Sequence, residues 1–199
     1  MQKTQLALFP LQLFLLPGES TRLHIFEERY KQLLSDYGGA GASFGIPFTE
    51  KGILSGLGSL VEVSKVIREY PNGSADIEVR CTDLFKIEQF FIRMGEKLYP
   101  GGDVVIMESD AFPPISDSLF KALDSFIKEH RPEQFKEILS PHLNVIGVAR
   151  ILQLDEGQKM KLVRSTRHEN MEKLLLNQIN VMNALYKQHG SIQGNLFLN

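Results

Sequence analysis

The sequence predicts an α+β protein, in which an antiparallel, strongly coiled sheet or small barrel precedes a bundle of helices. In the first half, short apolar runs alternate with turn residues, as expected for strands with one solvent-exposed face. In the second half, apolar residues recur at helical spacing. Between the halves, Pro113 and Pro114 exclude both a continuous helix and a central strand. We therefore expect a β-rich domain over residues 1–112 and a helical subdomain over residues 113–199.

The opening apolar run is predicted to be buried β structure. Residues 6–16 (LALFPLQLFLL) are interrupted by Pro10 and Gln12, and no small-residue cleavage site follows them, so they do not resemble a secretory signal. The run is also shorter than the roughly 20 apolar residues that a membrane-spanning helix needs. We expect a cytoplasmic protein that has no membrane partner.

Further strands follow in the first half, and one pair is predicted as a hairpin. Residues 61–68 (VEVSKVIR) alternate apolar and polar for most of their length, residues 71–73 (PNG) favour a turn, and residues 75–80 (ADIEVR) alternate again. Residues 84–92 and 103–108 are predicted as two more strands.

One helix interrupts the predicted sheet. Phe26, Tyr30, Leu33 and Leu34 fall on one face at helical spacing, and the glycines at 38 and 39 end the pattern. We expect Phe26 and Tyr30 to be buried on this face. Truncating a buried phenylalanine to alanine costs about 3–5 kcal/mol, so Phe26→Ala is expected to destabilise the domain.

Polar residues mark the starts of the helices in the second half. Ser116 is predicted to cap the first helix and Asp155 a later one, whereas Asn144 is predicted to cap the apolar segment 145–152. A short helix is expected around residues 135–139. The last helix should begin with a capping box of Thr166 and Glu169 and end at Gly190. Its apolar stripe is expected to pack in the core rather than form a peptide groove.

Composition and charge exclude several classes of function. The 22 basic residues nearly balance the 24 acidic ones, and the net charge of -2 argues against general binding of nucleic acid or anionic lipid. Cys81 is the only cysteine, so no intrachain disulfide can form. We expect Cys81 to be buried packing rather than a nucleophile.

The motifs of catalysis are missing from these 199 residues. No phosphate-binding loop occurs, and the five histidines lack the spacing of metal ligands. Gly56 and Gly58 are interpreted as strand glycines rather than as part of a dinucleotide-binding loop. Asp76, Glu78 and Glu88 are expected on solvent-exposed strand faces. We therefore predict no ATPase activity, no peptidase activity, no metal and no cofactor.

Several short motifs, taken in order, resemble the amino-terminal domain of the Lon proteases. They are residues 8–11 (LFPL), 16–18 (LPG), 23–27 (LHIFE) and 29–30 (RY), followed by 44–45 (FG), 56–63 (GLGSLVEV), 79–80 (VR) and 84–87 (LFKI). Together they cover most of residues 6–110. The chain departs from the family at Glu28, where proline is common, and at Cys81, where glycine is common.

The resemblance implies a PUA-like pseudo-barrel followed by a helical bundle. In Lon proteases this region helps to recognise unfolded or tagged proteins and supports assembly, while separate domains hydrolyse ATP and cut peptide bonds. It thus implies a non-catalytic module that binds flexible polypeptide. RNA binding is the alternative, because PUA-like barrels also occur in RNA-modifying proteins, and a small-molecule enzyme would require an enclosed polar pocket. The resemblance leaves the oligomeric state open.

Four polar residues of these motifs are candidates for a binding site: His24, Glu27, Arg29 and Arg80. We expect them to line a surface of the β-rich domain or a cleft beside the helical subdomain. Each also has a structural explanation. His24 can orient the chain that enters the helix, while Glu27 can interact favourably with the helix amino terminus and Arg29 with a neighbouring carboxylate.

Overall fold

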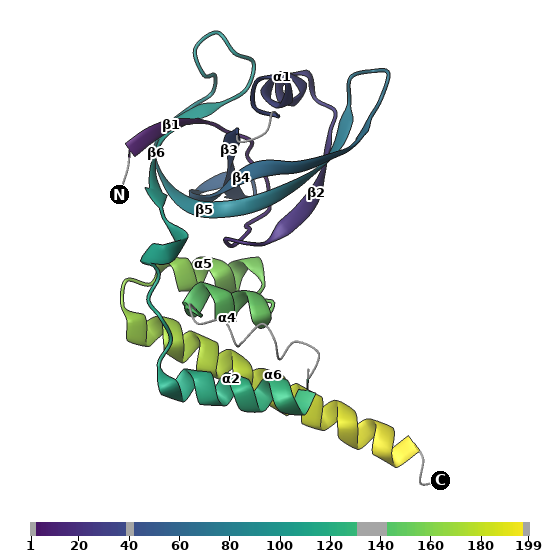
Figure 1. Cartoon of the computed structure of the whole chain (residues 1–199), viewed down its shortest axis with the longest axis vertical. Coiled ribbons are helices and arrows are strands. Elements are labelled where there is room, and N and C mark those ends of the chain that lie inside the picture. Colours follow the sequence, from purple (N-terminus) through teal and green to yellow (C-terminus); the bar gives the residue numbers. More distant parts are fainter. Residues whose placement is uncertain (1–2, 39–41, 131–142, 197–199) are drawn as a thin grey trace. The chain divides into compact units, whose positions relative to one another are not determined.

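The computed structural model describes residues 3–38, 42–130 and 143–196, and the chain forms two compact units, Met1–Ala111 and Phe112–Asn199 (Figure 1). We predicted the division between residues 112 and 113. The assignment of residues 1–112 and 113–199 as a β-rich domain and a helical subdomain stays a prediction.

The described residues of the first unit form a curled antiparallel sheet with one α-helix. Its elements are β1 (Lys3–Ala7), β2 (Ser20–Ile25), α1 (Glu28–Tyr37), β3 (Ser43–Glu50), β4 (Ile53–Glu69), β5 (Ala75–Phe91), β6 (Gly101–Met107) and the single 3-10 turn η1 (Ser109–Ala111). The strands pair in the order β1-β6-β5-β4-β3, and β2 pairs with β5. The chain after β1 pairs in parallel with β3, through Leu8 with Gly45 and Leu11 with Phe48. This pairing curls the sheet into the predicted pseudo-barrel.

Strand β5 is shared by two partners along one of its edges. β2 pairs with its first part, from Ala75 to Arg80, and β6 pairs with its second part, from Leu84 to Phe91. β4 runs along the opposite edge from Leu57 to Glu69. The first part of β5, the last part of β4 and β2 therefore form a three-stranded extension of the barrel, which we call the hairpin arm (residues 20–25 and 63–80).

A close approach of backbone to an aromatic ring organises the barrel core. Leu8, Phe85 and Val104 form a buried cluster. A β-carbon at Gly58 would overlap the ring of Phe85, and one at Gly45 would lie 2.6 Å from Leu8 and 2.8 Å from Phe85. The interpretation of Gly58 as a structural strand glycine is thereby confirmed.

The LPG motif forms a tight turn that attaches to β5. The amide of Glu19 donates to the carbonyl of Leu16 at 2.9 Å, and Gly18 has a φ of 89°, as a type II turn requires. The amide of Gly18 donates to Cys81, and the amide of Cys81 donates to Glu19. Just before this turn, the buried Ser59 hydroxyl donates to the Leu15 carbonyl at 2.8 Å and accepts from its amide at 2.9 Å. Cys81 is buried beside them, as predicted.

The predicted burial of Phe26 is wrong. Helix α1 begins at Glu28, and Glu27 before it is extended, with φ -72° and ψ 137°, so the helical periodicity does not reach back to Phe26. The Phe26 side chain is 62% exposed. Tyr30, in contrast, is only 5% exposed and its ring lies 3.9 Å from that of Phe9.

The second unit is helical, with α2 (Asp117–His130), α4 (Val145–Ile151), α5 (Glu156–Arg164) and α6 (His168–Leu196). The three predicted caps are present. Ser116 accepts from the Leu119 amide at 3.3 Å, Asn144 accepts from Gly147 at 3.0 Å, and Asp155 forms a capping box with Gln158. The predicted helix around residues 135–139 lies outside the described residues.

The predicted ends of the last helix are wrong. α6 begins at His168, one residue later than a capping box of Thr166 and Glu169 requires, and it continues through Gly190 to Leu196. One glycine in a long helix costs only about 1 kcal/mol relative to alanine, which does not suffice to end it. The apolar stripe of α6 is buried at Met171, Leu175 and Ile179, whereas Leu185 is exposed.

Tyr30→Ala and Phe26→Ala form a matched pair that tests this arrangement. Tyr30→Ala removes a buried ring and is expected to lower the free energy of unfolding of the β-rich unit by about 3 kcal/mol. Phe26→Ala removes an exposed ring and is expected to change it by less than about 1 kcal/mol. Urea denaturation followed by circular dichroism measures both, and equal losses for the two variants would contradict the structure.

Candidate functional site

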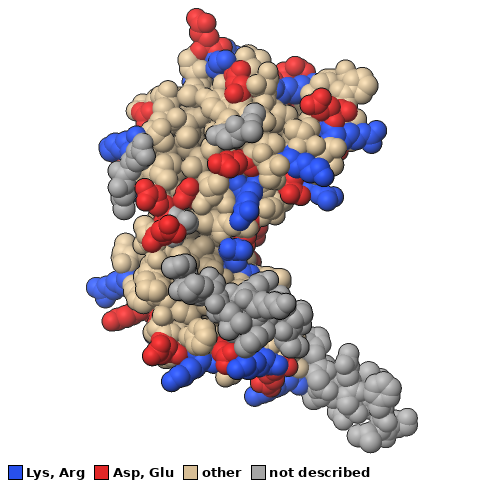
Figure 2. Space-filling view, viewed as in Figure 1, with Lys and Arg blue, Asp and Glu red and all other residues tan. Residues whose placement is uncertain are grey.

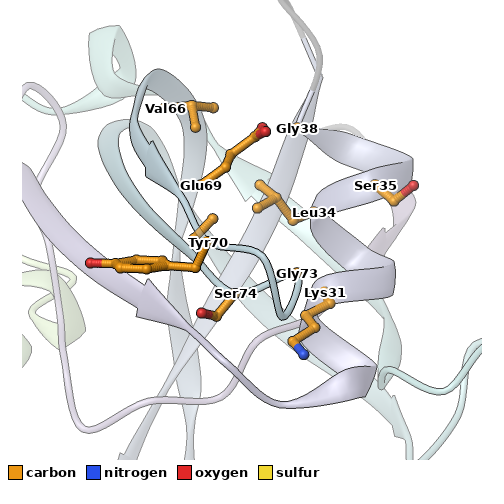
Figure 3. Close-up of a pocket in the computed structure, with 10 residues that line it drawn as sticks. Lys31, Leu34, Ser35, Gly38, Val66, Glu69, Tyr70, Gly73 and Ser74 are labelled. Carbon is orange, nitrogen blue, oxygen red and sulfur yellow. The ribbon is translucent and has the colours of Figure 1, made fainter.

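A groove of about 340 Å³ lies between α1 and the tip of the β4–β5 hairpin. One wall comes from α1, and the other comes from the end of β4 and the hairpin turn. Figure 3 shows Leu34 pointing from α1 toward β4, and Glu69 extending from β4 toward the end of α1 that carries Gly38. The groove, called the α1–β4 groove below, is lined by Lys31, Leu34, Ser35, Gly38, Val66, Glu69, Tyr70, Gly73, Ser74 and Ala75.

The β4 wall of the groove belongs to a stretch along which β3 does not pair with β4. β3 pairs with β4 only from Ile53 to Glu62. From Val63 to Glu69, β4 pairs only with β5 among the described strands. Both Val66 and Glu69 belong to this stretch, so the groove lies where the main chain of β4 can accept a further strand.

The hairpin turn is held to α1 by one lysine. The Lys31 ammonium group donates to the carbonyl of Asn72 at 2.8 Å and to Glu28 at 2.8 Å. The turn itself is a three-residue loop. The backbone amide of Tyr70 donates to the Ser74 carbonyl at 2.9 Å, and Gly73 has a φ of 76°. This bridge fixes the spacing between the two walls at one end of the groove.

A second cluster of side chains holds the three strands of the hairpin arm together. Asp76 on β5 accepts from the Tyr70 hydroxyl at 2.6 Å, and its other oxygen lies 2.6 Å from Nδ1 of His24 on β2. The hydrogen bond from Tyr70, followed by that from His24, lowers the pKa of Asp76. The same bond to Asp76 raises the pKa of Tyr70. The Arg68 guanidinium lies 4.7 Å from the centre of the Tyr70 ring.

Comparison with known proteins now places the chain. The sequence profile of the substrate-binding domain of ATP-dependent protease La (LON) matches residues 5–187.

The chain belongs to the LON substrate-binding domain family.

Solved structures agree with this assignment. The Lon N-terminal domain protein from Xanthomonas campestris is 27% identical over 86% of this chain and 97% of its own, with a TM-score of 0.63. The N-terminal domain of the Mycobacterium avium complex Lon protease is 12% identical over 89% and 98%, with a TM-score of 0.64, and shows a likeness of fold alone. No curated protein matches the chain. The α+β fold predicted from the sequence is confirmed.

The four predicted site residues of this LON domain do not line the groove. Glu27 and Arg29 form an ion pair with each other at 2.7 Å at the start of α1, and Arg29 also lies over the ring of Tyr30. His24 is bonded to Asp76, and Arg80 lies between Ser20 and Glu62 in the register of the hairpin arm. That these four side chains contact a ligand stays a prediction.

Sequence reasoning missed Glu69 and Tyr70 as groove residues. Leu34 and Val66 were recognised only as members of an apolar helix face and of an alternating strand. The signal that would have found them is the point where β3 begins, at Ser43 opposite Glu62, which no sequence pattern marks. Periodicity predicts each strand but not how far its neighbour extends.

The charged face of the hairpin arm mixes both signs. Arg22 lies opposite Glu78 on β5, and Lys65 on β4 lies opposite the same carboxylate. On the face drawn in Figure 2, Lys and Arg are interspersed with Asp and Glu over this LON domain and do not gather into one basic patch. This arrangement gives little attraction for a run of phosphates.

Other site chemistry is absent from the described part of the chain. Residues 3–38, 42–130 and 143–196 contain no group of three His, Cys, Asp or Glu residues that could hold a metal ion. Within the same ranges, no helix is long and apolar enough to cross a membrane. The Cys81 thiol is buried and lies 3.4 Å from the Leu15 carbonyl, so it is not placed to attack a substrate.

Asp76→Asn tests the cluster in the hairpin arm. The folded-state pKa of Asp76 is lowered, so its ionised form stabilises the fold above its unfolded pKa of about 3.9. This contribution is lost as the pH falls through the lowered value. We expect the urea midpoint of Asp76→Asn to lie below that of the wild type at neutral pH, and the two to converge below about pH 3.9. If the difference between the two urea midpoints did not change with pH, the charge of Asp76 would have no role in stabilising the fold.

Proposed function

We propose that this LON domain binds an extended, flexible segment of another polypeptide in the α1–β4 groove and does not alter it chemically. The observation that carries the proposal is the coincidence of the groove with the stretch of β4 that pairs only with β5. An extended peptide can add to such a stretch through main-chain hydrogen bonds, while its side chains enter the groove.

The character of the groove supports recognition of many sequences. Leu34 and Val66 offer apolar contact from opposite walls, and Val66 is 41% exposed. Main-chain hydrogen bonds do not depend on side-chain identity, so a strand added to β4 tolerates variation. A module that recognises unfolded protein requires this tolerance.

The family assignment supports the same function. The description of the family names a substrate-binding domain. Among the described residues, the groove is lined by no histidine or cysteine, and its serines, Ser35 and Ser74, have no histidine beside them in the lining that would activate a nucleophile. Binding without catalysis is therefore the function that the site supports best.

Val66→Gln and Ile67→Gln provide a matched test. The two side chains are neighbours in β4 and almost equally exposed, at 41% and 40%, but only Val66 lines the groove. We expect Val66→Gln to weaken the binding of a labelled, unstructured peptide about tenfold, because a buried valine contact is lost, and Ile67→Gln to leave it unchanged. Fluorescence anisotropy measures both affinities.

A second peptide tests the mode of binding. Methylation of alternate main-chain nitrogens removes hydrogen-bond donors but keeps the side chains, so strand addition predicts a severalfold loss of affinity. Labelled single-stranded RNA is titrated in parallel at two salt concentrations. Tight RNA binding that weakens steeply with salt, together with no binding of either peptide, would refute the proposal and favour RNA as the ligand.

A further inference from the structure

We infer that the α1–β4 groove selects extended polypeptides that place a lysine or arginine beside Glu69. This inference rests on the proposed function and specifies the class of segment that binds. It follows from the distribution of charge along the groove.

Glu69 is the carboxylate of the groove whose charge is not compensated. It is exposed at the end of β4, and its strand partner is Ala75, which lines the same groove. Among the described residues, no lysine, arginine or histidine forms an ion pair with it.

The neighbouring carboxylates differ in this respect. Glu28 is paired with Lys31 at 2.8 Å, and Asp36 is paired with Lys97 at 2.8 Å and accepts from Tyr99 at 2.7 Å. Asp76 is held by Tyr70 and His24 on the hairpin arm. An incoming cation thus finds a free partner at Glu69 and not at these three positions.

The end of helix α1 adds to the negative potential beside Glu69. Ser35 and Gly38, in the last turn and at the cap of α1, line the groove, and Figure 3 shows Glu69 extending toward Gly38. A helix carboxyl terminus carries a partial negative charge of roughly half an electron, and α1 has no basic residue in its last turn to offset it.

The rest of the groove matches the long stem of a basic side chain. Leu34 and Val66 lie on opposite walls and can cover the methylene groups of lysine or arginine while the charged end reaches Glu69. Lys31 lies toward the hairpin turn, where it is bonded to Asn72, and disfavours a second cation there. The groove is therefore polarised, with its cation-binding end at Glu69.

Three labelled peptides test the inference, identical except for a central lysine, norleucine or glutamate. The probes are extended sequences of about seven residues, which matches the stretch of β4 from Val63 to Glu69 that pairs only with β5 among the described strands. With the wild type, we expect the lysine peptide to bind best and the glutamate peptide worst. Glu69→Gln should weaken the lysine peptide about threefold to fivefold, the range for an ion pair in contact with solvent, and leave the norleucine peptide unchanged.

Two further variants sharpen the test. Glu69→Lys should reverse the order of the three affinities, so that the glutamate peptide binds best. Unchanged affinity of this variant for the norleucine peptide shows that the groove is intact. Glu50→Gln is the control, because Glu50 is an exposed carboxylate on β3 outside the groove. The preference for lysine should shrink at about 1 M salt, where charges in contact with solvent are screened.

The outcomes separate this inference from the proposed function. Equal affinity for the three peptides, each weakened by Val66→Gln, would overturn the charge preference and leave polypeptide binding in place. A lysine preference that persists in Glu69→Gln would assign it to another site and also overturn the inference. If no peptide binds the wild type, the proposed function fails and the inference fails with it.

Discussion

The unequal lengths of neighbouring strands are the constraint on which the candidate site depends. β4 and β5 each contain 17 residues, whereas β3 contains 8. The β4–β5 hairpin must therefore extend beyond β3, which pairs only with the first part of β4. The chain manages this extension with β2, which covers the β5 side of the arm, and with α1, which approaches the tip through Lys31. The β4 side is left with a groove in place of a strand, and the proposed function follows from that difference.

Two networks of polar contacts keep the hairpin arm in a defined position. On one face, Asp76 joins β2 to β5 through His24 and to the base of the turn through Tyr70. At the tip, Lys31 joins the turn to α1. Each uses a charged group within the 2.6–2.8 Å range of strong hydrogen bonds. A rigid arm matters for binding, because a strand that is already ordered loses less conformational entropy when a peptide is added to it.

Much of the architecture could be predicted from the sequence, and the failures have identifiable causes. The hairpin, the caps at Ser116, Asn144 and Asp155, and the burial of Cys81 followed from local pattern, because turn and cap chemistry acts over a few residues. The burial of Phe26 was predicted wrongly because the helix begins two residues after it, and the helix end at Gly190 because a long helix tolerates isolated glycines. The groove was missed because it depends on where β3 begins opposite β4, which is set by tertiary pairing.

An open strand edge carries a cost as well as an opportunity, since it can also join the same edge of another copy and start an extended sheet. β4 contains two irregularities where it leaves β3: Ser64 and Ile67 are extra residues in its register with β5. Such bulges increase the local twist, so the edge does not match a flat, identical edge over its whole length. Lys65 and Arg68 add like charges that repel an identical edge. The same stretch that can receive a mobile segment is thereby protected from self-association, and a variant with a straight, uncharged β4 would be expected to aggregate.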